Sequence, residues 1–570
     1  MDLFKIHVED RKYETWNIYD ATTMELLNNK EIKFDPIKEK LINGDIFKLK
    51  ESKPIVVHST IKKIKHISGV LVLTGNKTYG KFKNKMLYRC VPDDKRLPEF
   101  VVPYKPKITF NKKMINRYIT FRYLNWKHKH PTGQIQENIG EVNQLCNFYE
   151  YQMYCKSLYA SIANIKEKAK KKLRIHDEEW YVSDIISKNQ NIENRTSWDN
   201  IISIDSVGSK DLDDAISLIK QNDGNYLLSI YISNVSFWFD ALDLWESFTN
   251  RISTIYLPDR KRPMLPTILS DNICSLLEQK NRFVFVCDII VSSELNILSY
   301  TFKNALIKVT SNLHHKTNKL NGNDYYKKLE IFTRKMNKVS KYIDSVKNSS
   351  EVVAYHMVLM NYLCAKELKK HNTGIYRFTN LNNEYKAPDD ADENIKKFLK
   401  IWHSMGGQYC KFENIQEHEM LKLESYLHIT SPNRRLVDMI NMILLQDKLN
   451  LIKINDKSSK FCDRWINDEA IEYINTTMKS IRKVQTDCEV LFKCSEDTTL
   501  TNRVLDGYIF DKLERNDKLF QYIIYLPELK LTNRLTSTKN LENLLMYKFK
   551  IYIFMDEIRL KQKIRLLLIE

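Results

Sequence analysis

The chain has 570 residues, of which 43% are hydrophobic and 28% charged, and its formal net charge is +19 at pH 7. This composition is that of a folded globular protein with about three to five domains. No apolar run approaches the roughly 18 residues that a membrane helix needs, so no membrane span is expected. The positive charge fits a polyanionic partner but equally fits a lysine-rich genome, so charge alone decides nothing.

The ten cysteines are scattered, with no C-x-x-C pair and no grouping with histidine at zinc-site spacing. This pattern indicates reduced thiols in a cytoplasmic compartment and argues against a disulfide framework, a disulfide-linked partner or a structural zinc ion. The first residues, Met1–Asp10, are charged at once and lack the apolar run of a signal peptide. We therefore expect a cytoplasmic protein.

Residues 1 to about 150 show the short alternating runs of β-strands, such as Gly69–Leu73 and Phe100–Val102, separated by turn residues. Five of the 13 glycines lie between Gly69 and Gly140. In a glycine-poor chain, this placement favours the sharply bent strands of small barrels.

Residues 148–174 are predicted to be helical and end in a lysine-rich run, which is more typical of a solvated helix face than of an RNA site. Residues 196 to 496 then predict one large α+β unit. Its clearest helical patterns cover Glu351–Lys369, Pro432 to about Leu449, and Asn467–Cys494. The residues that follow return to short strands, which fit an OB barrel.

The segment Ile201–Ile216 carries the most informative pattern in the chain. An apolar run predicts a buried strand, a Ser/Gly loop follows it, and a hairpin then turns at Asn222-Asp223-Gly224. The four aspartates of this segment are Asp205, Asp211, Asp213 and Asp214. Four carboxylates on one loop repel one another unless a cation lies between them, and hard divalent cations are the natural occupants.

An EF-hand is the first competing interpretation, because Asp211 and Asp213 match its first and third ligand positions. It fails at Ala215, Ile216 and Asn222, where a ligand, the glycine and the final glutamate are missing. A solvated acidic loop is the second, and a buried strand that runs directly into the cluster argues against it. In a chain of net charge +19, an acidic pocket indicates a metal-dependent site acting on phosphate.

The pattern Ile-Asp, five residues, Asp-Leu-Asp-Asp-Ala at 204–215 resembles the signature of the RNB family, the RNase II and RNase R class of exoribonucleases. Further blocks resemble the same family, in the family's order. They are Ser253–Pro258, Pro263–Pro266, Leu269–Ser270, Cys274–Leu276, Arg282, Gly374–Arg377 and His428–Arg435. Several separate motifs therefore support one resemblance.

The resemblance implies a multidomain α+β fold, in which an RNB α/β catalytic domain is flanked by OB β-barrels. The implied parts are two cold-shock-type OB domains at 1–62 and 63–147, a helical linker at 148–195, the RNB domain at 196–496, and an RNA-binding OB domain at 497–570. No PIN nuclease domain is recognised, so a second, endonucleolytic activity is not implied.

The resemblance also implies hydrolysis of single-stranded RNA from its 3′ end to nucleoside 5′-monophosphates, by two metal ions about 3.5–4 Å apart. Two Mg²⁺ ions are the expected cofactors, and Mn²⁺ can substitute. The implied ligands are Asp205, Asp211, Asp213 and Asp214, and the sequence assigns none of them to a particular ion.

Arg434 is predicted to lie in the first turn of a helix, because Ser431 is a good N-cap and Pro432 suits the first helical position. There a guanidinium and the helix dipole together favour a phosphate. The resemblance makes Arg434 the residue that stabilises charge on the scissile phosphate. The structural alternative is a salt bridge at a helix start.

Tyr256 precedes Leu-Pro at the end of an apolar segment, and a buried structural tyrosine is the default interpretation. The resemblance implies instead that its ring stacks on the 3′-terminal nucleotide, an interaction worth about 1–3 kcal/mol per base. It further implies RNA contacts for Tyr376, Arg377 and Arg435.

Several positions depart from the family's usual residues. They are Asn234 for Asp, Leu436 for Tyr, Met442 for His, Gln485 for Glu, and Ala354-Tyr355 for Glu-Glu. These are supporting positions, and the four aspartates and Arg434 remain, so activity is expected while its rate and end-product length stay open.

Two main functions are therefore compatible with the sequence. The first is an active exoribonuclease acting on single-stranded RNA, as a monomer or within an RNA-processing assembly. The second is an RNA-binding protein with the RNB fold that has lost turnover, which the changes at Asn234 and Gln485 would favour. A nuclease that prefers DNA is a weaker third alternative.

Overall fold

The computed structural model describes residues 3–27, 34–51, 53–106, 114–381, 392–402, 405–515 and 517–569. The chain forms two compact units. Unit 1 consists of Met1–Tyr159, Leu257–Asp259 and Arg482–Glu570, and unit 2 consists of Ala160–Tyr256 and Arg260–Ile481. Among the residues in these ranges, none of the helices combines the length with the apolar character that a membrane span requires.

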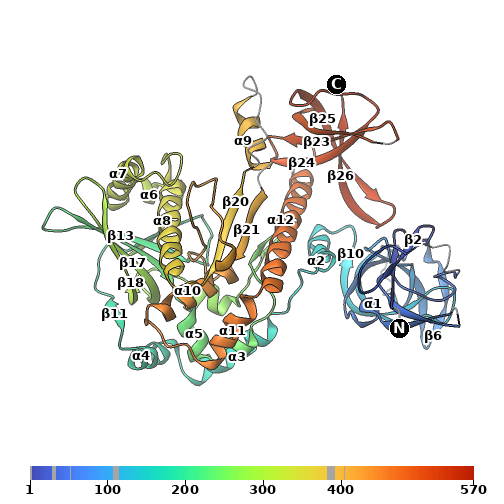
Figure 1. Cartoon of the computed structure of the whole chain (residues 1–570), viewed down its shortest axis with the longest axis horizontal. Coiled ribbons are helices and arrows are strands. Elements are labelled where there is room, and N and C mark those ends of the chain that lie inside the picture. The colour runs from blue at the N-terminus through green and yellow to red at the C-terminus, as the bar shows by residue number, and fades with distance from the viewer. Residues whose placement is uncertain are drawn as a thin grey trace. The chain divides into compact units, whose positions relative to one another are not determined.

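Unit 1 contains three β-sheets, coloured blue, cyan and red in Figure 1. The first has the strand order β2-β1-β3-β4 and the third has the order β24-β23-β22-β25-β26. The second has the order β5-β9-β10-β8-β7-β6, and an additional pairing of β5 with β7 closes it into a barrel. This closed arrangement, with β8 and β10 parallel, is that of an OB barrel.

The strands of unit 1 are β1 (Phe4–Val8), β2 (Trp16–Asp20), β3 (Ile46–Lys50), β4 (Lys53–His58), β5 (Ile67–Leu71), β6 (Thr78–Phe82), β7 (Lys85–Pro92), β8 (Phe100–Tyr104), β9 (Arg117–Asn125), β10 (Thr132–Glu141), β22 (Leu505–Glu514), β23 (Phe520–Leu526), β24 (Leu531–Ser537), β25 (Met546–Asp556) and β26 (Lys561–Leu568).

Two glycines let the second sheet close tightly. A Cβ atom at Gly69 would lie 2.9 Å from both Cys90 Sγ and a ring carbon of Phe121, and one at Gly133 would lie 2.7 Å from the same ring. Only glycine allows these strands to approach the aromatic core this closely. The prediction of bent barrel strands in this region is confirmed.

Unit 2 is built on a seven-stranded mixed sheet with the order β11-β18-β17-β14-β13-β12-β19. Its central strands β14 and β17 are apolar and buried over most of their length, as expected for strands covered on both faces. The strands are β11 (Ile192–Arg195), β12 (Ile202–Asp205), β13 (Asp214–Lys220), β14 (Tyr226–Ser233), β17 (Asn281–Val291), β18 (Ile297–Lys308) and β19 (Ser311–His314). Two short ribbons accompany it, β15 (Ile255–Tyr256) with β16 (Lys261–Arg262), and β20 (Ile375–Asn380) with β21 (Met405–Lys411).

Long helices pack around this sheet. Helix α8 (Ser349–Lys370) contacts β12, α7 and α10, and its start is fixed by a capping box between Asn348 and Glu351. The first half of α12 (Asp468–Glu496) lies beside β21 in Figure 1, where Asn475 exchanges hydrogen bonds of 2.8 and 2.9 Å with the Tyr409 backbone. These two helices confirm the predictions for 351–369 and 467–494.

The remaining helical segments are α1 (Thr60–Lys63), η1 (Thr74–Asn76), α2 (Leu145–Cys155), α3 (Ala163–Ile175), α4 (Glu178–Lys188), α5 (Val235–Ala241), η2 (Trp245–Ser247), η3 (Leu269–Ile273), α6 (Asn318–Asn321), α7 (Asp324–Val339), α9 (Glu393–Trp402), η4 (Phe412–Asn414), α10 (Leu436–Lys448) and α11 (Asp456–Trp465).

The predicted fold class, barrels together with an α/β unit, is confirmed, but the predicted linker at 148–195 is wrong in detail. Helices α2 and α3 are separate, and residues 192–195 form strand β11 of the large sheet. Periodicity could not reveal this strand, because its partner β18 lies far along the chain. The other domain boundaries stay predictions.

Candidate active site

The four predicted aspartates lie at one edge of the seven-stranded sheet. Strand β12 ends at Asp205, strand β13 begins at Asp214, and the two strands are antiparallel neighbours. The end of β12 and the start of β13 therefore meet at the same edge. Asp211 and Asp213 belong to the connecting loop, so the structure brings all four residues together.

The loop is held in place through Leu212, whose buried side chain packs into the core of unit 2. The Leu212 amide donates to Ser275 Oγ at 3.1 Å, and its carbonyl accepts from the Leu276 amide at 3.0 Å. The Asp213 carbonyl accepts from the Ser233 amide at 2.8 Å. Anchoring Leu212 in the core fixes the aspartates on either side of it.

Burial gives the aspartates unusual electrostatics. Asp213 is 1% exposed and Asp214 is 9% exposed. Burial raises the pKa of Asp213 to about 7. Burial, and then the neighbouring charges of Asp205 and Asp213, raise the pKa of Asp214, and burial also raises the pKa of Asp205. Because burial disfavours the ionised form of these carboxylates, a cation bound among them would stabilise that form.

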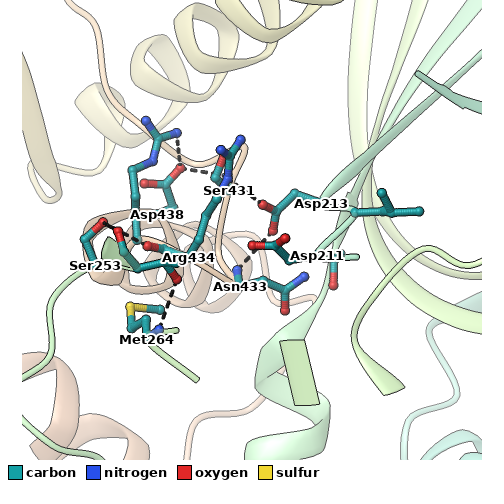
Figure 2. Close-up of polar contacts among 12 residues, drawn as sticks. Asp211, Asp213, Ser253, Met264, Ser431, Asn433, Arg434 and Asp438 are labelled. Atoms are coloured by element: carbon teal, nitrogen blue, oxygen red, sulfur yellow. Dashed lines mark hydrogen bonds and ion pairs between the residues drawn. The ribbon is translucent and has the colours of Figure 1, made fainter. Parts of the chain in front are cut away.

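Arg434 is the first cation of the site. Its Nε donates to Asp213 Oδ2 at 2.9 Å, and the Asn433 amide donates to Asp213 Oδ1 at 3.1 Å (Figure 2). The Arg434 side chain is 44% exposed. Among the residues that the structure describes, its two terminal amino groups have no hydrogen-bond partner. They remain available to an anion.

The prediction that Arg434 lies in the first turn of a helix is wrong. Helix α10 begins at Leu436 with Arg435 as its N-cap, and residues 432–434 form a separate turn. Arg435 is extended because it bridges to Ser253, with the Leu436 amide donating to Ile252 O at 2.9 Å. This long-range pairing overrides the local signals of Ser431-Pro432.

Asp211 has two partners on the β15–β16 ribbon. The Tyr256 hydroxyl donates to Asp211 Oδ2 at 3.0 Å, and Lys261 Nζ donates to Asp211 Oδ1 at 2.9 Å. Lys261 Nζ also donates to Asp271 Oδ1 at 2.9 Å. Tyr256 is 42% exposed, so the default interpretation of a buried structural tyrosine is wrong.

The other predicted RNA contacts, Tyr376, Arg377 and Arg435, differ in their burial and in their partners. Tyr376 is completely buried and its hydroxyl donates to Thr373 O at 2.9 Å, so the prediction for it is wrong. Arg377 is half-buried, with its guanidinium 5.6 Å from the ring centre of Tyr409. Arg435 donates to Asp438 Oδ1 at 2.8 Å and is the N-cap residue of helix α10.

Asn234, where the family resemblance implies aspartate, belongs to a buried amide network. Its Nδ2 donates to Asn304 Oδ1 at 3.1 Å and to Gln446 Oε1 at 2.7 Å, while its Oδ1 caps helix α5 through the Ser236 amide. A carboxylate could not donate to these two oxygens. The asparagine at position 234 is therefore complementary to the two oxygens that surround its side-chain amide.

The remaining departures occupy structural positions. Leu436, Met442 and Tyr355 are buried in the core, Ala354 lies on α8, and Gln485 lies on α12. The Tyr355 hydroxyl donates to Ser340 O at 3.2 Å, which satisfies it inside the protein.

Within the described residues, no three carboxylate, thiol or imidazole side chains converge closely enough to hold one metal ion. The donors nevertheless suit a hard divalent cation, because they are buried oxygens. Asp205 and Asp214 have no cation in direct contact among the described residues, although Arg434 attracts both from a distance and opposes the rise in their pKa. The buried Oδ1 of Asn433, beside Asp213, also lacks a hydrogen-bond partner within the described ranges. The chemistry of these oxygens therefore fits such an ion, whereas their spacing within the described residues would have to close around it.

Sequence reasoning missed three residues of this site: Lys261, Asn433 and Asp438. Asp438 is buried and accepts from the Ser431 amide at 2.8 Å, which holds the turn that carries Arg434. Lys261 follows Tyr256 across a Leu-Pro-Asp-Arg turn, and that turn was a usable hairpin signal.

Comparison with known proteins agrees with this geometry. The RNB domain family matches residues 193–320. Ribonuclease R of Ureaplasma parvum is 41% identical over 111 residues, which cover 19% of this chain and 15% of that protein. Exoribonuclease 2 of Buchnera aphidicola is 24% identical over 449 residues, covering 60% of this chain and 69% of that protein. The chain therefore matches ribonuclease R over only a small part of that protein's length.

Solved structures share the fold over nearly the whole chain. RNase R of Mycoplasma genitalium, in complex with ribose-methylated single-stranded RNA, has a TM-score of 0.67 at 15% identity and covers 99% of this chain and 100% of that one. Yeast Ssd1, described as a pseudonuclease, has a TM-score of 0.59 at 13% identity and covers 96% and 80%. The match to the RNB domain family identifies residues 193–320 as an RNB domain, and the rest of the chain shares the fold of these solved structures.

Proposed function

We propose that this chain is a hydrolytic 3′-to-5′ exoribonuclease that degrades single-stranded RNA to nucleoside 5′-monophosphates. The observation that carries the proposal is the buried aspartate edge beside Arg434, whose terminal amino groups have no partner within the described ranges. Similarity to proteins named ribonuclease R and exoribonuclease 2 supports it, as does a net charge of +19.

The proposed cofactor is a pair of Mg²⁺ ions, for which Mn²⁺ can substitute, held by Asp205, Asp211, Asp213 and Asp214. Ions bound there would activate water and stabilise the leaving 3′ oxygen. Arg434 would bind a phosphate oxygen through its free amino groups, which suits charge that builds in the transition state. Tyr256, exposed at the same edge, would stack on the terminal base, and Arg377 and Arg435 would contact the RNA farther along.

The wider assignments are proposals of the same kind. All ten cysteines are free, which supports a cytoplasmic protein with reduced thiols. We expect a monomer that can join an RNA-processing assembly. The first N-terminal barrel would end at residue 62, the second at residue 147 and the RNB domain at residue 496, where the C-terminal barrel follows. The RNB domain would begin at β11.

An RNA-binding protein without turnover is the second candidate. The RNB fold is shared with yeast Ssd1, described as a pseudonuclease, so the fold alone does not decide between the two. Here all four aspartates and Arg434 are present and lie together. That constellation favours the active enzyme.

Direction and product test the proposal. RNA labelled at its 5′ end should shorten progressively to a limit of a few nucleotides, because a 3′ end would enter a closed site. Nucleoside 5′-monophosphates should accumulate without added phosphate, which chromatography of the products measures. Internal cuts, or a requirement for inorganic phosphate, would contradict the hydrolytic exonuclease.

A further inference from the structure

A two-stranded ribbon covers both oxygens of Asp211. Tyr256 on β15 and Lys261 on β16 are directly opposed across this antiparallel ribbon, so their side chains share one face. The Tyr256 hydroxyl bonds Oδ2 of Asp211 at 3.0 Å and Lys261 Nζ bonds Oδ1 at 2.9 Å. The β15–β16 ribbon therefore hydrogen-bonds to both carboxylate oxygens of Asp211, a proposed metal ligand.

Lys261 is itself held in place by a second carboxylate. Asp271, on the π-helical turn η3, accepts from the same ammonium at 2.9 Å. The side chains of Lys261, Asp211 and Asp271 are 22%, 10% and 13% exposed. The charges of a triad so shielded from water are screened less than those of a surface ion pair.

An ammonium and a divalent cation compete for the same carboxylate oxygen, because like charges at that separation repel. Asp205 and Asp214 have no cation in direct contact among the described residues, and Arg434, which contacts Asp213, attracts both carboxylates only from a distance. The four aspartates are therefore not equivalent towards a metal ion, because Lys261 already neutralises Asp211 and Arg434 already neutralises Asp213.

We propose that Lys261 and Tyr256 form a latch on Asp211, which must open before Asp211 can hold a metal ion. The first ion binds at Asp205 and Asp214, and the second binds more weakly because it must displace Lys261. This inference rests on the proposed two-ion site. Opening also frees the Tyr256 ring for the terminal nucleotide, so RNA and the second ion favour the same open state.

Titration of the metal-free full-length chain with Mn²⁺, followed by calorimetry and electron paramagnetic resonance, tests the latch. The wild-type chain should bind two ions with separated dissociation constants. Lys261→Met should tighten the weaker constant about tenfold or more, because it removes a shielded charge-assisted bond, and should leave the tighter constant unchanged. Tyr256→Phe, which keeps the ring and removes the hydroxyl, should tighten the weaker constant by a smaller factor.

Two variants serve as controls. Lys261→Arg keeps a cation at the latch and should keep two separated constants. Lys327→Met removes an exposed lysine that pairs with Asp324 at 3.0 Å on helix α7, and should change neither constant. Equal wild-type constants, or an unchanged weaker constant in Lys261→Met, would overturn the latch. So would a loss of affinity at both sites, which would make Lys261 a support of the fold.

The titration requires no RNA cleavage, so the two proposals fail separately. A chain that shows the shift in Lys261→Met but cleaves no RNA would contradict the exoribonuclease and keep the latch. A chain that cleaves RNA without the shift would contradict the latch alone. A chain that binds no Mn²⁺ would contradict both.

Discussion

Replacing Asp213 by asparagine should slow RNA hydrolysis by about 10³-fold or more while leaving RNA affinity nearly unchanged. Asp213 is 1% exposed, and its two oxygens accept from Arg434 Nε and from the Asn433 amide. Asparagine keeps the size but removes the charge, and because its amide nitrogen cannot accept a hydrogen bond, one of the two bonds is lost. Affinity should persist because backbone phosphates are bound mainly through distributed positive charge.

Single-turnover hydrolysis and fluorescence anisotropy with single-stranded RNA separate the two effects. Asp223→Asn is the matched control, since Asp223 is exposed in the hairpin turn between β13 and β14 and its asparagine can keep the bond to the Asn225 amide. Equal loss of binding and hydrolysis in Asp213→Asn would indicate a folding defect. Undiminished hydrolysis would remove Asp213 from the mechanism.

Arg434→Ala should lower the single-turnover rate by about 10²–10³-fold, or roughly 3–4 kcal/mol, with little change in RNA affinity. The guanidinium binds Asp213 through Nε only, so its terminal amino groups can meet charge that builds on phosphate oxygens. The substitution also leaves buried Asp213 without its cation, which adds to the loss.

Two further variants sharpen this test. Arg434→Lys keeps the charge but loses the planar fork, so its rate should fall between those of the wild type and the alanine variant. Arg334→Ala, which removes a surface arginine paired with Glu330 on α7, should change neither rate nor affinity. Weaker binding of RNA by Arg434→Ala at an unchanged rate would place Arg434 in ground-state binding instead.

Local patterns predicted those parts of the site that depend on neighbouring residues. The apolar run into Asp205 and the turn at 222–224 specify β12, β13 and β14, because alternation and glycine act over a few residues. The long helices followed from their periodicity for the same reason.

Local sequence patterns could not predict the contacts between segments that lie far apart in the chain. The Arg435 bridge to Ser253 moved the start of α10 past a good N-cap, since tertiary pairing outweighs a capping preference of about 1 kcal/mol. The contact between Lys261 and Asp211 joins strand β16 to the loop between β12 and β13, and no spacing rule encodes it. Tyr376 shows the converse error, in which a resemblance assigned a surface role to a core residue.

Cleavage of end-labelled single-stranded RNA and DNA, each incubated with the full chain in Mg²⁺ or in EDTA, is the decisive test of the proposed activity. RNA should shorten progressively in Mg²⁺, DNA should be cleaved little or not at all, and neither should be cleaved in EDTA, because the aspartate edge needs a cation to act. Binding of RNA without any shortening in Mg²⁺, or equal shortening in EDTA, would contradict it.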